Sequence, residues 1–482
     1  MPPPASRSPP APSRPSSGAN AARLREFSDG VFQPTEPPVR KLIAALSAVF
    51  CLAGMAADSR AQIFNPTQFM LGNGMQVVLI EDHRAPVVHH MVWYRVGAAD
   101  EQPGVSGVAH YLEHLMFKGT PNVLPGDFSK IVAREGGRDN AFTSSDYTGY
   151  FQTIARDRLE LVMSMEADRM SELDPKASDA KPELQVVMEE RLSRTDNSPG
   201  ALFGEQLDAA QYLSHPYGRP VIGWPAEIQR LTLNDAMTFY RSHYAPNNAI
   251  LVVAGDVRPG ELRALAEKYY GLIPMRPIPP RFRPQEPNQL AARRLSMSDA
   301  RVVQPSMRRS YLAPSRTAGE KQHAVPLAVL SEILNAPTGR LHKSLVQGDG
   351  PAVSASAWYS SMSLDQSTFG FSASPKNGRK LEEVEAALDK VIADLLANGV
   401  TDEEMRLART GMQAETIYAR DSLSGAARIF GVALTTGLTV EDVEAWPKLV
   451  DAVTREQVLA AARHVFDLRR SVTGYLLPKD QS

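Results

Sequence analysis

The segment HYLEH, residues 110–114, places two histidines and a glutamate within five positions. On an α-helix, residues four apart lie on the same face, so His110 and His114 could bind one metal ion, with Glu113 beside them. Hydrolytic zinc sites hold the ion with three protein ligands and leave one position for water. The alternative interpretation is a helix that carries two structural histidines, so the prediction of a metal site depends on a third ligand.

A third ligand could come from KPELQVVMEERLSRTDN, residues 181–197, which has the pattern of an amphipathic helix. Its carboxylates Glu183 and Glu190 are seven positions apart and therefore share one face. Helical carboxylates are usually solvated, so spacing alone does not make either residue a ligand. Spacing also cannot bring this helix to residues 110–114, and both interpretations stay open at this point.

The pattern HYLEH, followed 76 positions after His114 by Glu190, resembles the inverted zinc motif of the pitrilysin family of metallopeptidases. This family includes insulin-degrading enzyme and mitochondrial processing peptidase. Similarity to its half-length, processing-peptidase-like branch covers about residues 65 to 478. The segments that carry it are GGRDNAFTSSDYTGYF (136–151), HPYGRPVIGWPAEIQRL (215–231) and YAPNNAILVVAGDV (244–257). The resemblance implies that the chain is the zinc-bearing subunit of a zinc metalloendopeptidase.

The resemblance also implies a role for each residue of the motif. His110, His114 and Glu190 would bind one Zn²⁺ per chain, and Glu113 would be the general base. Glu183 matches the family's accessory acid, which supports the site without binding the ion. Zinc lowers the pKa of a bound water toward neutrality, which suits the hydrolysis of a peptide bond.

The segment 136–151 begins with two glycines and alternates weakly, which predicts a strand after a turn. The resemblance makes it the edge strand of the active site, with Asn140, Ala141 and Phe142 lining the substrate-binding site. An edge strand has unpaired N–H and C=O groups, so an extended peptide can bind as an added strand. We therefore expect peptides or unfolded proteins as substrates.

Self-sufficient members of the family carry an Arg and a Tyr in the second half, which hold the substrate carbonyl. The similar segment here is RLHKSLVQGDGPAVSASAWY (340–359), and its alignment places these two positions on Val346 and Val353. Neither valine has a side-chain donor, although Arg340 or Tyr359 could take the roles after local realignment. We expect a homologous partner subunit to supply the Arg and Tyr. The alternative is a non-catalytic metal-binding or scaffold subunit of a heterodimeric assembly.

The elements that must position these residues fall into two halves. Prolines recur every two to four positions in PMRPIPPRFRPQEPNQ, residues 274–289, which is typical of a linker. We therefore predict an N-terminal zinc peptidase domain (62–273), a Pro-rich linker (274–300) and a C-terminal non-catalytic repeat domain (301–482).

The two halves end on similar segments. LTLNDAMTFYRSHYAPNNAILVV and VTREQVLAAARHVFDLRRSVTGY align at an offset of 222, which pairs Thr232 with Thr454. We predict an α+β fold of two duplicated domains, each a mixed, mostly antiparallel β-sheet covered by helices, which enclose a substrate chamber with the partner subunit. At an offset of 221, the positions of the two histidines and the glutamate of HYLEH are taken by Ser331, Asn335 and Leu334, so only the first half would bind the metal.

The N-terminal residues have a different composition. Residues 1–38 are rich in Pro, Ser and Ala, which predicts a disordered segment or a misread upstream extension. Residues 39–61 have a basic start, an apolar stretch and a small-x-small cleavage motif, which is typical of a signal peptide. We expect a bacterial periplasmic or secreted protein, with the mitochondrial matrix as the alternative, because arginines in the Ser-rich start also suit a transit peptide.

Cysteine content and net charge restrict the metal ligands and the binding partners that we expect. The single cysteine, Cys51, lies in the expected signal peptide, so a metal in the mature chain must be held by His and carboxylate side chains. The net charge of -2 gives no reason to expect nucleic acid as a partner. The apolar stretch of the signal is short, so we expect no stable membrane span in the mature chain.

Overall fold

The computed structural model describes residues 63–479. The expected extension (1–38) and signal peptide (39–61) lie outside the described residues. Within the described range, no helix combines the length and the apolar character that a membrane span requires.

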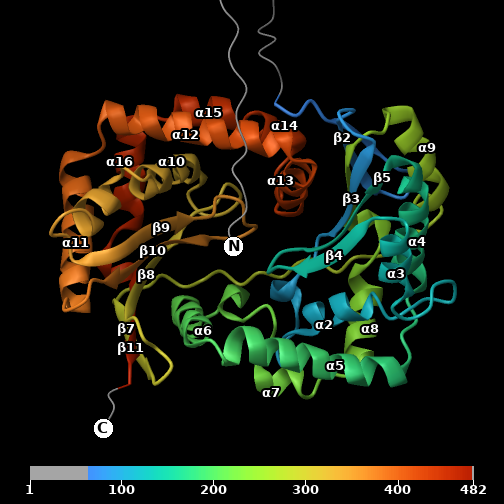
Figure 1. Cartoon of the computed structure of the whole chain (residues 1–482), viewed down its shortest axis with the longest axis horizontal. Helices are drawn as coiled ribbons and strands as arrows, with labels where there is room; N and C mark the ends of the chain where they lie inside the picture. The colour runs from blue at the N-terminus through green and yellow to red at the C-terminus, as the bar shows by residue number, and fades with distance from the viewer. Residues whose placement is uncertain (1–62, 480–482) are drawn as a thin grey trace, which may run out of the picture. The chain divides into compact units, whose positions relative to one another are not determined.

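The first half is a β-sheet with helices packed on it. Its strands are β1 (Thr67–Met70), β2 (Gln76–Glu81), β3 (Val87–Tyr94), β4 (Arg138–Thr143), β5 (Thr148–Ala155) and β6 (Ala249–Gly255). Its helices are α2 (Val108–Leu115), α3 (Asp127–Arg134), α4 (Leu159–Glu172), α5 (Ala177–Arg191), α6 (Pro199–Gln211), α7 (Pro225–Ile228), α8 (Leu233–His243) and α9 (Pro259–Tyr269). Figure 1 shows α2 and α5, which contain the predicted metal-site residues, side by side.

The strand order of the first sheet is β1-β2-β6-β3-β5-β4. β2 and β6 are parallel, and the other neighbouring pairs are antiparallel. Every residue of the central strand β6 is buried, as expected where both faces of a sheet are covered. β4 pairs only with β5 and forms the edge of the sheet, which confirms the edge strand predicted within segment 136–151.

The second half has the same plan. Its strands are β7 (Arg293–Asp299), β8 (Ser306–Ala313), β9 (Ala352–Tyr359), β10 (Ser367–Pro375) and β11 (Ser471–Pro478). Its helices are α10 (Ala324–Asn335), α11 (Leu381–Asn398), α12 (Asp402–Asp421), α13 (Leu423–Thr435), α14 (Val440–Glu444), α15 (Trp446–Ala452) and α16 (Arg455–Val465). The strand order is β7-β11-β8-β10-β9, with β7 and β11 parallel and the other pairs antiparallel.

The five strands β2-β6-β3-β5-β4 and the five strands β7-β11-β8-β10-β9 therefore repeat one topology, to which the first sheet adds β1, and this confirms the predicted α+β fold of two similar domains. Thr232 caps α8 and Thr454 caps α16. Each threonine hydroxyl accepts a hydrogen bond from the backbone N–H of the third residue of its helix, and the side chain of that third residue accepts one from the backbone N–H of the threonine. The strands that follow, β6 and β11, begin 222 residues apart, at the offset predicted from the sequence.

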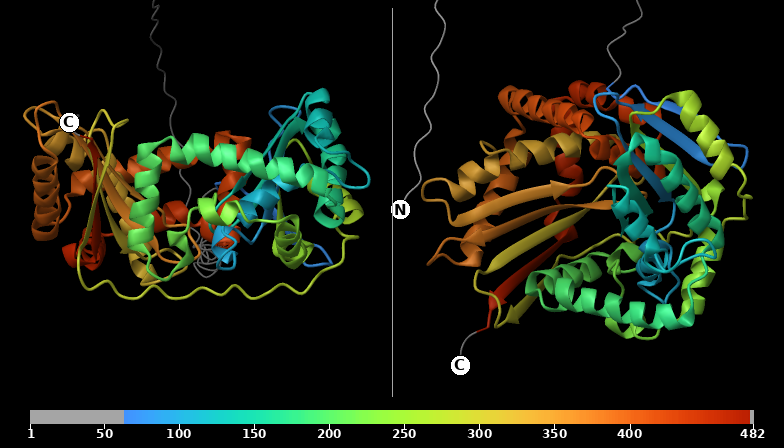
Figure 2. Two further views of the ribbon diagram at one scale, coloured as in Figure 1. Left: turned by 90° about the horizontal axis from the view of Figure 1, so that it is seen from below. Right: turned by 45° about the vertical axis from the view of Figure 1, so that its right-hand side comes forward.

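The linker differs from its prediction at its C-terminal end. Residues 274–292 contain no helix or strand and form the extended trace drawn in yellow-green in Figure 2. Residues 293–299, predicted as part of the linker, instead form β7, which pairs in parallel with β11. The prolines end before this stretch, and RRLSMSD alternates between half-buried and exposed residues, as an edge strand does. The linker is therefore shorter than the predicted 274–300.

Helix α13, from the second half, packs against β3 and β6 of the first sheet. Phe430 lies with Met91 and Trp93 of β3 in one apolar cluster on this face. Gly431 permits the close approach, because a Cβ atom at this position would lie 1.9 Å from Cε2 of Trp93. The first sheet is thus covered on one face by its own helices and on the other by a helix that begins 168 residues after β6, the last strand of that sheet, ends (423 − 255).

Substituting Gly431→Ala should test this contact. Trp93 is fully buried, so the added methyl group must displace either the indole ring or the helix. We expect a loss of about 1–3 kcal/mol in the free energy of unfolding, measured by urea titration. Gly260→Ala in α9 is the control: a Cβ atom at that position would have no other atom within 4 Å, so stability should stay the same or rise by up to about 1 kcal/mol. Equal stability of the two variants would contradict the close packing of α13.

Candidate metal centre

Helix α2 is fixed at its N-terminus, where an α-helix has unpaired N–H groups. The buried carboxylate of Glu101 accepts hydrogen bonds from the backbone N–H groups of Gly107 and Ala109, at 2.9 to 3.1 Å. Gly107 has a φ of 88°, and a Cβ atom there would lie 2.5 Å from the carbonyl oxygen of Ile222. These contacts fix the direction in which α2 enters the core, with Leu112 fully buried.

Helix α5 packs against α2 through apolar residues and one buried hydrogen bond. Leu184 and Val187 belong to the same core cluster as Leu112. The hydroxyl of Tyr111 donates to the carbonyl oxygen of Ala180 at 2.7 Å. This packing turns the shared face of Glu183 and Glu190 toward the histidines, which the sequence spacing could not establish.

His110, His114 and Glu190 converge on one point. Nε2 of His114 lies 3.1 Å and Nε2 of His110 lies 3.4 Å from Oε2 of Glu190, and the three ligand atoms all lie within 4.8 Å of one another. Ligands of a tetrahedral zinc ion, each about 2.0–2.2 Å from the metal, lie about 3.3 Å from each other. The donor set and its spacing therefore fit one Zn²⁺.

Neighbouring side chains orient the three candidate ligands and pair with their charges. Nδ1 of His114 lies 2.8 Å from Oε1 of Glu183, which orients the ring and directs Nε2 toward Glu190. Glu183 also forms an ion pair with Lys118. Arg194 lies 2.5 Å from Oε1 of Glu190, so Oε2 is the oxygen left for a metal. Lys118 and Arg194 were not identified from the sequence, although each lies only four positions after His114 or Glu190, just beyond the end of α2 or α5.

The pKa shifts follow from the same contacts. Burial lowers the pKa of His110 to about 4, so its imidazole is neutral at pH 7, which is the form that binds metal. Burial alone would also lower the pKa of His114, but its hydrogen bonds with Glu183 and Glu190 raise it to about 9. A bound cation would therefore replace the proton of His114.

Glu113 lies beside the cluster and contacts the edge strand. Its Oε2 accepts a hydrogen bond of 2.5 Å from the hydroxyl of Thr143, at the end of β4. Burial raises the pKa of Glu113, although this hydrogen bond acts in the opposite direction. Thr143 was not identified from the sequence; the available signal was its place two residues after Ala141, on the same face of the strand.

The predicted substrate-binding residues occupy both faces of β4. The backbone N–H of Ala141 donates to Oδ1 of the exposed Asn140 at 2.8 Å. This N–H group therefore points away from the β5 ladder, along the outer edge of the sheet. Phe142 packs against Trp93 on the face covered by α13, and the guanidinium of Arg428 lies 5.1 Å from its ring centre.

Arg340 and Tyr359, the alternative hydrogen-bond donors considered from the sequence, make their contacts within the second half. Arg340 donates to Glu404 at 2.6 and 2.8 Å and to the carbonyl oxygen of Gly399 at 2.7 Å. The hydroxyl of Tyr359 donates to the carbonyl oxygen of Pro314 at 2.5 Å. Val353, on the edge strand β9, exposes 57% of its surface.

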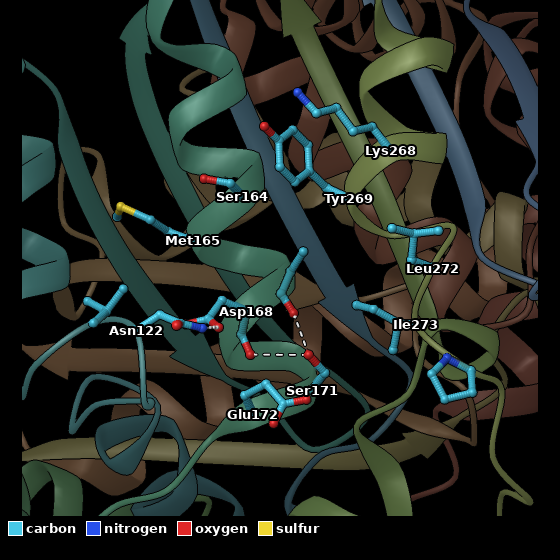
Figure 3. Close-up of a pocket in the computed structure, with 13 residues that line it drawn as sticks. Asn122, Ser164, Met165, Asp168, Ser171, Glu172, Lys268, Tyr269, Leu272 and Ile273 are labelled. Atoms are coloured by element: carbon cyan, nitrogen blue, oxygen red, sulfur yellow. Dashed lines mark hydrogen bonds between the residues drawn. The ribbon is translucent and has the colours of Figure 1, made fainter.

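A pocket of about 670 Å³ beside α4 and α9 contains none of the predicted site residues. Figure 3 shows that Ser171 bonds back to its own helix, where its hydroxyl donates to the carbonyl oxygens of Ala167 and Asp168. The carboxylate of Asp168 accepts from Asn122 at 2.6 Å. Because these polar groups already have partners, the cluster on α2 and α5 is the better candidate for chemistry.

Substituting Glu183→Gln should weaken zinc binding while the three ligands remain. Loss of a carboxylate that orients a ligating histidine typically reduces metal affinity about 10–100-fold. Competition with a chromogenic chelator would measure the affinity. Glu189→Gln is the matched control, because Glu189 is exposed on the same helix. Unchanged affinity in the Glu183 variant would show that His114 does not need this contact.

Comparisons with known proteins agree with this geometry. Residues 76–224 match the family model "Insulinase (Peptidase family M16)" and residues 230–412 match "Peptidase M16 inactive domain". The zinc protease PqqE of Helicobacter pylori is 32% identical over 81% of this chain and 88% of its own length. A probable mitochondrial-processing peptidase subunit beta of Schizosaccharomyces pombe is 30% identical over 42% of this chain and 44% of its own length.

Solved structures show the same fold. A crystal structure of a protease from Helicobacter pylori superimposes with a TM-score of 0.80 at 30% identity, over 86% of this chain and 100% of that chain. The first half of the periplasmic protease PqqL from Escherichia coli gives a TM-score of 0.72 at 18% identity, over 86% of this chain and 92% of that chain. The chain belongs to the insulinase-like peptidase family M16, a family of zinc peptidases, as the HYLEH motif predicts.

Proposed function

We propose that this protein is a zinc-dependent endopeptidase that cleaves unfolded peptides. The observation that carries the proposal is the convergence of His110, His114 and Glu190 on one point, with Glu113 beside it. These three residues would hold the ion, which lowers the pKa of a water molecule and polarises a peptide carbonyl.

Glu113 would act as the general base and then as the general acid. Its Oε2 is held by Thr143, so Oε1 is the oxygen available to a water molecule. Burial raises the pKa of Glu113 toward the working pH, which favours both acceptance of a proton and its return to the leaving amine. Thr143 would orient the carboxylate between the metal-binding helix and the edge strand.

The substrate would bind along β4 as an added strand. Asn140 covers the outward N–H of Ala141, and a peptide carbonyl could replace its side-chain oxygen at that position. The end of β4 lies next to Glu113, because Thr143 makes the connecting hydrogen bond. This places a bound peptide bond within reach of the base and the metal ligands, with little dependence on side-chain sequence.

The second half of the catalytic apparatus would come from a homologous partner subunit. The family resemblance aligns Val346 and Val353 with the positions of the Arg and Tyr, and Arg340 and Tyr359 are hydrogen-bonded within the second half. Each missing donor of this kind typically costs about 2.7 to 4 kcal/mol of transition-state stabilisation. A partner that supplies both groups would form the substrate chamber with this chain.

We further propose export to the bacterial periplasm. The signal-like segment 39–61 supports it, and one structural neighbour is described as a periplasmic protease.

Hydrolysis of an unstructured, quenched fluorescent peptide tests the proposed activity. The zinc-loaded chain should cleave it, and Glu113→Gln should lower the rate by at least about 10²–10⁴-fold while zinc content stays the same. Cleavage by the wild type alone would establish the peptidase and remove the need for a partner. If both proteins bind zinc and neither cleaves, addition of the homologous subunit should restore activity to the wild type only. If activity is not restored, a non-catalytic metal-binding or scaffold role becomes the better account.

Backbone methylation of the peptide tests the added-strand model. Along a strand, alternate residues direct their N–H groups to opposite sides. N-methylation of every second residue in one register should therefore abolish cleavage of the peptide, measured by mass spectrometry. The same number of methyl groups in the other register should leave most of the cleavage intact. Equal effects in both registers would rule out binding along an edge strand.

A further inference from the structure

A second cluster of metal-ligating side chains lies in the C-terminal half, away from the HYLEH helix. Glu320 precedes a short 3₁₀ helix (Lys321–His323) at the start of α10, and His464 lies in the last turn of α16. The His323 and His464 rings are stacked, with centres 4.7 Å apart and planes inclined by 22°. The Glu320 carboxylate lies beside both rings, so elements far apart in the sequence bring three possible ligands together.

The separations suit a shared cation better than direct hydrogen bonds. Nε2 of His323 lies 3.5 Å from Oε2 of Glu320, and Nδ1 of His464 lies 3.6 Å from Oε1. Both distances are long for a hydrogen bond but close to the roughly 3.3 Å between ligands of one tetrahedral zinc ion. The chosen ligand atoms lie within 4.8 Å of one another, as they do at the HYLEH cluster.

The first half shows that the fold does not require these residues. The offset of 221 that aligns α2 with α10 pairs Glu320 with Ala99 and His323 with Gln102. The offset of 222 that aligns α8 with α16 pairs His464 with Ser242. Those three residues line a cavity of about 850 Å³ in the first half. The second half thus has three side chains that can bind a metal at positions where the first half has an alanine, an amide and a hydroxyl.

We propose that Glu320, His323 and His464 form a second binding site for a zinc-like transition-metal dication. Two imidazoles and one carboxylate favour such ions over Ca²⁺ or Mg²⁺, which prefer oxygen ligands. His323 and His464 are half-buried, whereas Glu320 is 58% exposed, so water could reach an ion bound here.

Charged groups around the cluster both favour and oppose the binding of a cation. The C-terminal end of α16 carries partial negative charge, which favours a cation near His464. Arg470 is close enough to His464 to oppose it. Gln322 donates to Glu320 at 3.1 Å and orients the carboxylate. A bound ion would tie the start of α10 to the end of α16, the two helices that correspond to α2 and α8 of the first half.

Metal stoichiometry of the full chain tests the site directly. Metal-free protein is equilibrated with excess Zn²⁺, dialysed and measured by mass spectrometry of the metal, with Co²⁺ absorption as a second readout. We expect about two ions per chain for the wild type and about one for the triple variant Glu320→Ala, His323→Gln, His464→Ser, which installs the residues of the first half. His342→Gln, a histidine outside both clusters, should leave both ions bound.

A variant of the first site separates this inference from the proposed peptidase. His110→Gln with His114→Gln should still bind about one ion, and Zn²⁺ should raise its melting temperature; adding the triple substitution should abolish both effects. If the triple variant misfolds by circular dichroism, Glu320→Gln alone should weaken the second ion. A wild-type chain that binds one ion, lost on changing His110 and His114, would overturn the second site and leave the proposed peptidase intact. If the wild type binds one ion, and the ion stays bound in the His110 and His114 variant but is lost in the triple variant, the HYLEH centre would be contradicted and the second site supported.

Discussion

The packing of α2 against α5 is the constraint on which the candidate metal centre depends. The two histidines lie on one helix and Glu190 lies 76 residues beyond His114, so the ligand set exists only where the two helices touch. Buried apolar residues of both helices and the bond from Tyr111 to Ala180 hold this contact. Burying charged groups is costly unless they are paired, and here His114 lies between two carboxylates whose other oxygens meet Lys118 and Arg194. The centre can therefore keep its geometry before an ion binds.

The first sheet links the candidate metal centre to the edge strand β4. β4 ends at Thr143, whose hydroxyl donates a hydrogen bond to Glu113. The outer side of β4 is the edge of the sheet, where a peptide could pair with its backbone groups. The opposite face of this sheet is covered by α13, where Gly431 meets Trp93. The second half therefore completes the core of the first, which gives the repeat a physical role although it lacks the HYLEH residues.

The two halves show how one topology can carry different chemistry. Apart from the extra strand β1 of the first sheet, the two sheets have the same strand order and direction, yet α10 has Ser331, Leu334 and Asn335 where α2 has its motif. Conversely, the cluster around Glu320 has no counterpart at Ala99 in the first half. Backbone arrangement is set by buried apolar residues, whereas a site needs only a few polar side chains at tolerant positions, so the two can diverge independently.

Local features could be predicted from the sequence because they depend on neighbouring residues. Helical periodicity placed His110 and His114 on one face, and the alignment of Thr232 with Thr454 at an offset of 222 marked the repeated helices. The linker boundary could not be predicted, because β7 is short and polar and its partner β11 lies at the other end of the domain. Family resemblance supplied what spacing left open at the metal site.

The roles of Glu183 and Glu190 show the difference most clearly. The sequence determined that both carboxylates share one face of one helix, since they are seven positions apart. Tertiary structure alone decided that Glu190 meets Nε2 of both histidines while Glu183 meets Nδ1 of His114. The physical reason is that the crossing of α2 and α5 is set by packing among buried side chains from the whole domain, which no local pattern encodes.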